Sequence, residues 1–145
     1  MSIFFSYKNS TISNKISKKK NIKRWIIYII EKEFNKSVEE ITFYFTDDSE
    51  IIDINKKYLN HNYFTDIITF NYSKEHSISG DIIISIDTVK LNAKDYNVTF
   101  ENELHRVIIH GILHMIGFDD STECQKAEMR EKENWALNIL YSKWK

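Results

Sequence analysis

The stretch from His110 to Asp120, which reads HGILHMIGFDD, does most to decide how this chain folds and what chemistry it can carry. Residues four apart on a helix lie about 40° apart around the axis and about 6 Å along it, so the imidazoles of His110 and His114 project from one face. Gly117 can adopt the left-handed conformation that ends a helix, and the chain can then bend. This spacing predicts that His110, His114 and Asp120 meet at one point.

Two imidazoles and one carboxylate are a ligand set for zinc. They leave a tetrahedral ion with an open fourth position, which is typical of a catalytic site rather than a closed structural one. A pair of histidines four apart is often incidental, but the full spacing H-x-x-x-H-x-x-G-x-x-D on an apolar helix favours a metal site. The sequence therefore predicts one Zn²⁺ per chain, held by His110, His114 and Asp120.

Three residues near this motif are weaker candidates for the metal. Asp119 could replace Asp120 as a ligand, but the spacing favours Asp120. Cys124 lies one helical turn past Asp120 and could face the metal, although we expect a small buried thiol instead. His105 lies about 140° from His110 around the helix axis, so we expect it to be structural or exposed.

The remaining sequence predicts a small sheet and several helices. Alternating or β-branched apolar runs predict four strands, at about residues 3–7, 41–46, 67–70 and 82–86, with the last two in the centre of the sheet. Apolar spacing and N-cap residues predict helices at about residues 18–35, 47–58, 87–96, 99–116 and 121–141, with Asp87 and Thr99 as two of the caps. This order predicts an α+β fold: a mixed four-stranded sheet with helices packed on it and the metal site on the His110–His114 helix.

Length and composition predict the general class of protein. The 145 residues have room for one core, so we expect a single domain over residues 1–145. A net charge of −1 argues neither for nor against a nucleic-acid partner. The single cysteine excludes an intramolecular disulfide, and the longest apolar stretch, Trp25 to Ile30, is far shorter than the roughly 20 residues that cross a bilayer. We expect a cytoplasmic protein without a membrane partner.

Several segments resemble the bacterial endoribonuclease family usually called the YbeY or rRNA maturation factor family, whose signature reads H-G-x-L-H-x-x-G-[YF]-D-H. The residues that match this signature are His110, Gly111, Leu113, His114, Gly117, Phe118 and Asp119. Outside it, the residues that resemble the family are Asn55, Tyr58, the segment TDIITF at 65–70, and Gly80-Asp81-Ile82. The resemblance runs from about residue 41 to about residue 132, which is most of the chain.

The resemblance implies a zinc-dependent, single-strand-specific endoribonuclease that matures the 3′ end of small-subunit rRNA and takes part in ribosome quality control. It implies ribosomal RNA and the small ribosomal subunit as partners, and the oligomeric state stays open. Its motif also places Thr65 and Asp66 at the end of a strand near the metal cleft, where Asp66 would be catalytic together with His110, His114 and Asp120. A strand-capping role for Thr65 and Asp66 is the alternative.

Two positions depart from the family pattern. Asp120 stands where the family has a third histidine, which keeps a zinc ligand but makes the site more anionic. Leu59 stands where the family has an arginine, which removes an expected phosphate contact. We expect Lys56, Lys57 or His61 to supply this charge, because an RNA strand must be held beside several carboxylates.

Two other functions stay open. A metzincin-like metalloprotease shares the ligand skeleton, but it needs a glutamate directly after the first histidine, where this chain has Gly111. A non-catalytic ribosome-assembly factor could hold the same metal for structure alone. Because Gly111 leaves no obvious general base beside the metal, both water and the RNA 2′-hydroxyl stay open as nucleophiles.

Overall fold

The structure is a computed structural model that describes residues 2–59 and 65–144. The strands are β1 (Ser2–Tyr7), β2 (Ser37–Thr46), β3 (Ile67–Asn71) and β4 (Ser77–Ser85). The helices are α1 (Ser10–Ser13), α2 (Lys19–Tyr28), the π-helical turn η1 (Ile29–Glu33) that continues α2, α3 (Asp48–Leu59), α4 (Ile86–Asp95), α5 (Phe100–Ile116) and α6 (Glu123–Lys143). The predicted α+β class is confirmed, and the short α1 and the π turn are the additions to the predicted order.

The four strands form one mixed sheet in the order β1-β2-β4-β3. β1 pairs with β2 and β2 with β4 in parallel, whereas β3 runs antiparallel to β4. The prediction that the third strand is central is therefore wrong, because β3 lies at an edge. The reason is that β4 pairs with two strands. On one side it forms a hairpin with β3, and on the other it pairs with the longer β2, so β3 has only one neighbour among the described strands.

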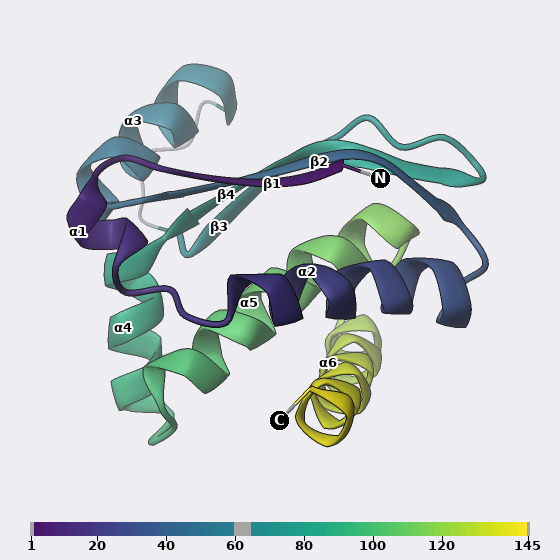
Figure 1. Ribbon diagram of the computed structural model, residues 1–145. Coiled ribbons are helices and arrows are strands. Elements are labelled where there is room, and N and C mark those ends of the chain that lie inside the picture. The colour runs from purple at the N-terminus through teal and green to yellow at the C-terminus, as the bar shows by residue number, and fades with distance from the viewer. Residues whose placement is uncertain (1, 60–64, 145) are drawn as a thin grey trace.

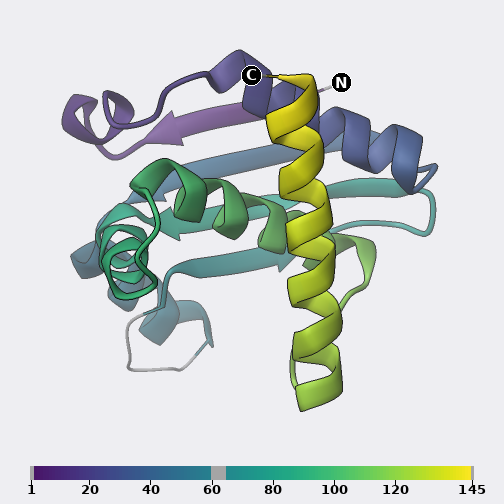
Figure 2. The same cartoon turned by 90° about the horizontal axis from the view of Figure 1, so that it is seen from below.

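The helices lie mainly on one face of the sheet. α2, α5 and α6 cover that face, α4 stands at one end of it, and α3 lies on the opposite side (Figure 1). Seen from below, α6 crosses the direction of the strands while α5 runs beneath them (Figure 2). This arrangement puts the end of α5 and the beginning of α6 near the β3 edge.

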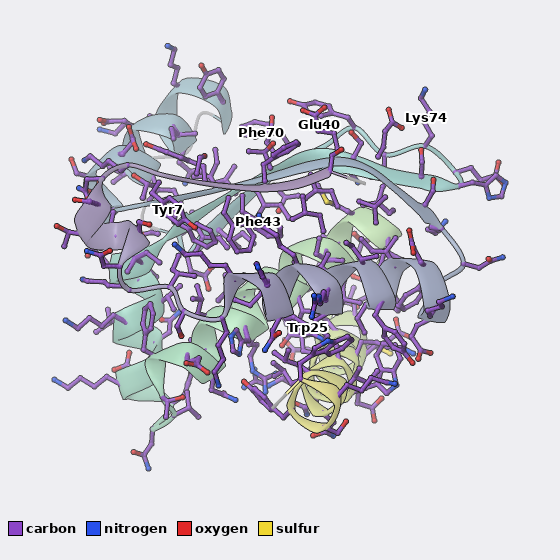
Figure 3. All side chains as sticks on the ribbon, viewed as in Figure 1. Tyr7, Trp25, Glu40, Phe43, Phe70 and Lys74 are labelled. Carbon is purple, nitrogen blue, oxygen red and sulfur yellow. The ribbon has the colours of Figure 1, made fainter. Side chains whose placement is uncertain are left out.

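The core fills the space between the sheet and these helices. Phe43 points from the sheet toward the helices, whereas Glu40 and Phe70 point from the opposite face (Figure 3). Trp25 is fully buried, and its Nε1 donates a hydrogen bond to the carbonyl of Ala136 at 2.8 Å, which joins α2 to α6. The alternation of apolar residues along β2 is thus explained by burial of one face.

Helix caps fix where α4 and α5 begin. Thr99 caps α5 as predicted, and its side chain accepts a hydrogen bond from the backbone of Asn102. α4 is capped by Ser85 rather than by the predicted Asp87. Ser85 ends β4 with its hydroxyl at the first helical turn, while the carboxylate of Asp87 accepts a hydrogen bond from the backbone of Asp48 at 3.1 Å.

Within the segments that the structure describes, every helix is too short or too polar to cross a lipid bilayer.

Candidate metal centre

α5 holds the two histidines of the motif close to the sheet. A glycine at position 111 lets the helix approach, because a Cβ there would lie 2.9 Å from Ile67 Cδ1 and 3.1 Å from Ile82 Cδ1. His110 and His114 flank this contact, and both side chains are partly exposed. The tight packing at Gly111 therefore places both imidazoles at the β3 edge of the sheet.

Gly117 ends α5 and turns the chain back toward the histidines. Its φ of 128° is a backbone conformation that side-chain-bearing residues rarely adopt. The backbone N–H of Phe118 then donates to the carbonyl of Leu113 at 3.0 Å, which closes the helix end. Three residues beyond the glycine, Asp120 comes within ion-pair distance of both imidazoles, as the spacing predicts.

The three side chains have the geometry of a metal ligand set. Asp120 Oδ2 lies 3.3 Å from His110 Nε2, and Asp120 Oδ1 lies 3.4 Å from His114 Nε2. One donor atom from each residue lies within 4.8 Å of the other two. Ligands at about 2.0–2.1 Å from a tetrahedral zinc ion are about 3.3 Å apart, so these residues fit such an ion. Asp119, the alternative ligand, is exposed and lies outside this group.

A carboxylate that the sequence did not reveal supports His110 from behind. Glu133 of α6 is 5% exposed, and its Oε2 lies 2.7 Å from His110 Nδ1. Its Oε1 accepts a hydrogen bond from Arg106 at 2.9 Å. Burial alone would raise the pKa of Glu133, but the hydrogen bonds from His110 and Arg106 outweigh it and lower this pKa.

The contact with Glu133 also changes the pKa of the His110 imidazole. Burial alone would lower the pKa of His110, but the hydrogen bond and charge of Glu133, together with Asp120 and Asp66, outweigh burial and raise it. The interaction at Nδ1 leaves Nε2 directed toward Asp120. Carboxylate–histidine pairs of this kind orient metal ligands in proteins.

Thr65 and Asp66 lie directly before β3 and face the same cleft as the histidines. The hydroxyl of Thr65 donates to the carbonyl of Ile67 at 3.2 Å, so it also shapes the strand start. Asp66 Oδ2 accepts a hydrogen bond from Asn92 at 3.4 Å. Burial raises the pKa of Asp66, with smaller contributions from neighbouring carboxylates. Asp66 is thus a half-buried acid that lines the same cleft as the three donors.

Two hollows open beside the donors. The first, here called the β3 hollow, has a volume of about 800 Å³ and is bounded by α3, β3 and the end of α5. The second, here called the α6 hollow, has a volume of about 410 Å³ and is bounded by α4, α5 and α6. Asp66, Ile67, His110 and Asp120 line both. His110 and Asp120 therefore lie where the two hollows adjoin, and His114 faces the β3 hollow.

Several other predicted residues lie away from the donors. Cys124 is exposed, which corrects the expected buried thiol; it lies in the first turn of α6, before Met129, the first buried residue of that helix. His105 is structural: it is 3% exposed, and its Nδ1 lies 3.0 Å from the Tyr141 hydroxyl. Burial lowers the pKa of His105 to about 4.

Two of the three residues proposed to replace the family's arginine line neither hollow. Lys56 and Lys57 are exposed on α3 and line neither the β3 hollow nor the α6 hollow. His61, the third candidate, lies outside the described residues. Lysine and arginine side chains instead line the α6 hollow, on the other side of the donors.

An α+β fold with two histidines and a carboxylate at the floor of an open cleft is typical of metal-dependent hydrolases. The sequence model of the family described as Endoribonuclease YbeY matches residues 6–141. The chain therefore belongs to the endoribonuclease YbeY family.

Individual relatives agree with this assignment. The chain is 45% identical to an endoribonuclease YbeY of Parabacteroides distasonis over 85% of this chain and 86% of the relative. It is 50% identical to an endoribonuclease YbeY of Azobacteroides pseudotrichonymphae over 82% of this chain and 85% of the relative. Its fold is similar to the solution structure of a Thermotoga maritima protein, with a TM-score of 0.69 and 28% identity, over 99% of this chain and 90% of that one.

Proposed function

We propose that this protein is a zinc-dependent, single-strand-specific endoribonuclease. It acts in the cytoplasm on ribosomal RNA of the small subunit, in late maturation of the 3′ end and in ribosome quality control. The family supports cleavage of RNA. The observation that carries the metal dependence is the separation of the donor atoms, 3.3 Å and 3.4 Å, at the junction of two open hollows.

His110, His114 and Asp120 hold the ion, one per chain. A bound divalent ion supplies Lewis acidity to a phosphodiester oxygen and lowers the pKa of a coordinated water molecule. Glu133 keeps the proton of His110 on Nδ1, so Nε2 stays free to bind. Two imidazoles and one carboxylate form the zinc ligand set of several hydrolytic enzymes.

Asp66 is the proton-transfer residue in this proposal. It lines the cleft on the sheet side of the donors, and burial raises its pKa, which brings its proton uptake closer to neutral pH. Asn92 orients its carboxyl group through the 3.4 Å hydrogen bond. Asp66 then exchanges a proton with the attacking or leaving oxygen, which is a role that Gly111 cannot fill.

The packing of Gly111 argues against a metalloprotease. A metzincin places a glutamate at this position to take a proton from water. Here even a Cβ would press on Ile67 and Ile82, so a glutamate side chain would have to enter the apolar contact between α5 and the sheet. An unpaired carboxylate buried there would cost several kcal/mol.

The experiment is a cleavage assay with RNA and protein substrates. The purified protein is incubated with a single-stranded rRNA fragment, with the same fragment in a duplex and with casein, each with and without a chelator. We expect chelator-sensitive cleavage of the single-stranded RNA alone, with loss of activity and of stoichiometric metal in His114→Ala. Chelator-sensitive cleavage of casein with intact RNA would overturn the proposal.

Two further readouts separate the alternatives. A 2′,3′-cyclic phosphate on the product would identify the RNA 2′-hydroxyl as the nucleophile, whereas a 5′-phosphate with a free 3′-hydroxyl would identify water. A folded, metal-free His114→Ala variant that restores rRNA maturation in cells lacking the wild-type protein would favour the non-catalytic assembly factor. The variant Asp66→Asn should bind metal normally and lose cleavage.

A further inference from the structure

The α6 hollow differs in charge from the β3 hollow. Among its described lining residues, the β3 hollow has amide, hydroxyl, carboxyl and imidazole groups but no lysine or arginine. The α6 hollow is lined by three cationic side chains, those of Arg106, Lys126 and Arg130. Positive charge beside the donors is therefore concentrated on one side of the cleft.

One of these cations is already engaged. Arg106 donates to Glu133 at 2.9 Å and to Asn134 at 2.8 Å, and its side chain is 18% exposed. Its guanidinium therefore neutralises Glu133 and holds α5 against α6. It has a structural role that leaves little capacity for a ligand.

The other two cations are loosely held at the rim. Lys126 lies 3.7 Å from Glu123, and Arg130 lies 3.7 Å from Glu133, which is longer than a hydrogen bond. Their side chains are 58% and 54% exposed, respectively. They are four residues apart on α6, so both side chains lie on the same face of the helix. Both can turn toward an anion at little energetic cost.

Of the four carboxylates among the described residues that line the α6 hollow, two are buried, whereas Asp66 is half-buried and the side chain of Asp120 is 40% exposed. Glu103 is 4% exposed and Glu133 is 5% exposed, so both belong to the floor. Asp120 is one of the three metal donors. An anion that enters from solvent therefore meets Lys126 and Arg130 before it meets Glu103 or Glu133.

An aromatic ring stands at the same hollow. Tyr96 ends α4, lines the α6 hollow and is 58% exposed. Exposed tyrosine rings stack on nucleobases with little dependence on the base, and they commonly do so beside cations that hold the backbone. A basic pair and an exposed ring at one hollow match the phosphate and the base of a single nucleotide.

We propose that the α6 hollow is a nucleotide subsite. Lys126 and Arg130 bind a phosphate adjacent to the cleaved bond, and Tyr96 stacks on the neighbouring base. The RNA strand then passes from the β3 hollow over the donors into the α6 hollow. This inference rests on the proposed function, since it takes single-stranded RNA as the substrate.

The test measures binding by the metal-loaded protein, separately from cleavage. The probe is a fluorescent single-stranded oligoribonucleotide with 2′-O-methyl groups, which is checked for integrity after each titration, and its anisotropy is measured at several salt concentrations. The variants are Lys126→Ala/Arg130→Ala, Tyr96→Ala and Tyr96→Phe. The control is Lys56→Ala/Lys57→Ala, which removes the same charge from α3.

The double variant on α6 should raise Kd about tenfold or more and reduce the slope of log Kd against log salt by about 0.7 for each lost contact. Tyr96→Ala should raise Kd at least about fivefold without changing that slope, and Tyr96→Phe should bind normally. If the Lys126→Ala/Arg130→Ala variant bound the probe as tightly as wild type, the proposed subsite would be wrong, but the RNA substrate would not. Absence of wild-type binding would overturn the RNA substrate and the subsite together.

Discussion

His110 is oriented from two sides. Its Nδ1 lies 2.7 Å from Glu133, and its Nε2 lies 3.3 Å from Asp120. Because a carboxylate accepts the proton of Nδ1, the tautomer with a free Nε2 lone pair is the stable one. Arg106 in turn holds Glu133. A residue distant in sequence thus decides which nitrogen of His110 can bind a metal.

Replacing Glu133 by glutamine should weaken metal binding. The amide keeps the size of the side chain but removes the charge that raises the basicity of His110, so we expect zinc affinity to fall about 10- to 100-fold. Competition with a chromophoric chelator measures this, and the visible spectrum of the Co²⁺-substituted protein reports the ligand geometry. The matched control is Glu131→Gln, at an exposed position of the same helix. Wild-type affinity in Glu133→Gln would show that Glu133 does not position the ligand.

The sequence predicts the three donors but not Glu133, and the reason is their distance along the chain. The three donors fall within eleven residues, so helix geometry alone brings two of them together. Glu133 is 23 residues from His110, and their contact depends on how α6 crosses α5. The one local signal was a glutamate on the apolar stripe of α6, whose buried members are Met129, Glu133, Ala136, Leu137 and Leu140.

Among the elements, α5 was the most predictable because both of its ends have local signals. Thr99 caps its beginning and Gly117 ends it. The beginning of α4 was less predictable because Ser85 and Asp87 both have N-cap chemistry, and only the end of β4 decides between them. The edge position of β3 depends on which strand pairs with β4, which is a long-range choice.

The end of α5 yields the next prediction. Gly117 has a φ of 128°, and no heavy atom of the described residues would lie within 4 Å of a Cβ at this position, so Gly117→Ala would suffer backbone strain without a clash. We expect a loss of about 1–3 kcal/mol in the free energy of unfolding. Zinc affinity should fall as well, because the bend at Gly117 returns Asp120 to the histidines.

Urea denaturation in chelator measures the stability of Gly117→Ala, and zinc competition measures its affinity. Ser121→Ala is the control, since it removes an exposed side chain from the same loop and keeps the backbone hydrogen bond to Gln125. If Gly117→Ala were as stable as the control, the prediction of backbone strain would be wrong, because the loop would have adopted a conformation that alanine tolerates.

In the molecule as a whole, the three donors are partly exposed and none of them belongs to the hydrophobic core. The core includes the buried face of α5, the helix that carries both histidines, but most of it lies in β1, β2, β4, α2 and α6. We therefore expect chelation to leave the far-UV circular dichroism spectrum and cooperative unfolding intact. Added zinc should raise the melting temperature. At a free zinc concentration 100 times Kd, binding should add about 3 kcal/mol to the free energy of unfolding. Unfolding on chelation would instead make the metal part of the fold.

Acid should destabilise the folded protein because the buried His105 resists protonation. His105 has a folded pKa of about 4 and an ordinary value of 6.5, mainly because of burial; Glu101 and Lys18 act on it in opposite directions. The unfolded chain therefore binds more protons between these two values. Stability from this residue is complete above about pH 6.5 and is lost as the pH falls toward 4, by about 3 kcal/mol.

Urea unfolding of the chelated protein between pH 7.5 and pH 4 tests this, because chelation removes metal release as a cause. His105→Gln is neutral across the range and should lose less stability than wild type over the same interval. His76→Gln, at an exposed histidine, is the control and should follow wild type. Parallel curves for wild type and His105→Gln would contradict the prediction.

The exposed thiol at the beginning of α6 makes the direction of a bound strand measurable. Cys124 is the one cysteine of the chain and lies two residues before Lys126. A maleimide dye would therefore label the wild-type protein at a single position beside the α6 hollow. Energy transfer from that dye to an oligoribonucleotide labelled at its 5′ or its 3′ end would then report which end lies nearer α6, and hence the polarity with which the RNA crosses the cleft.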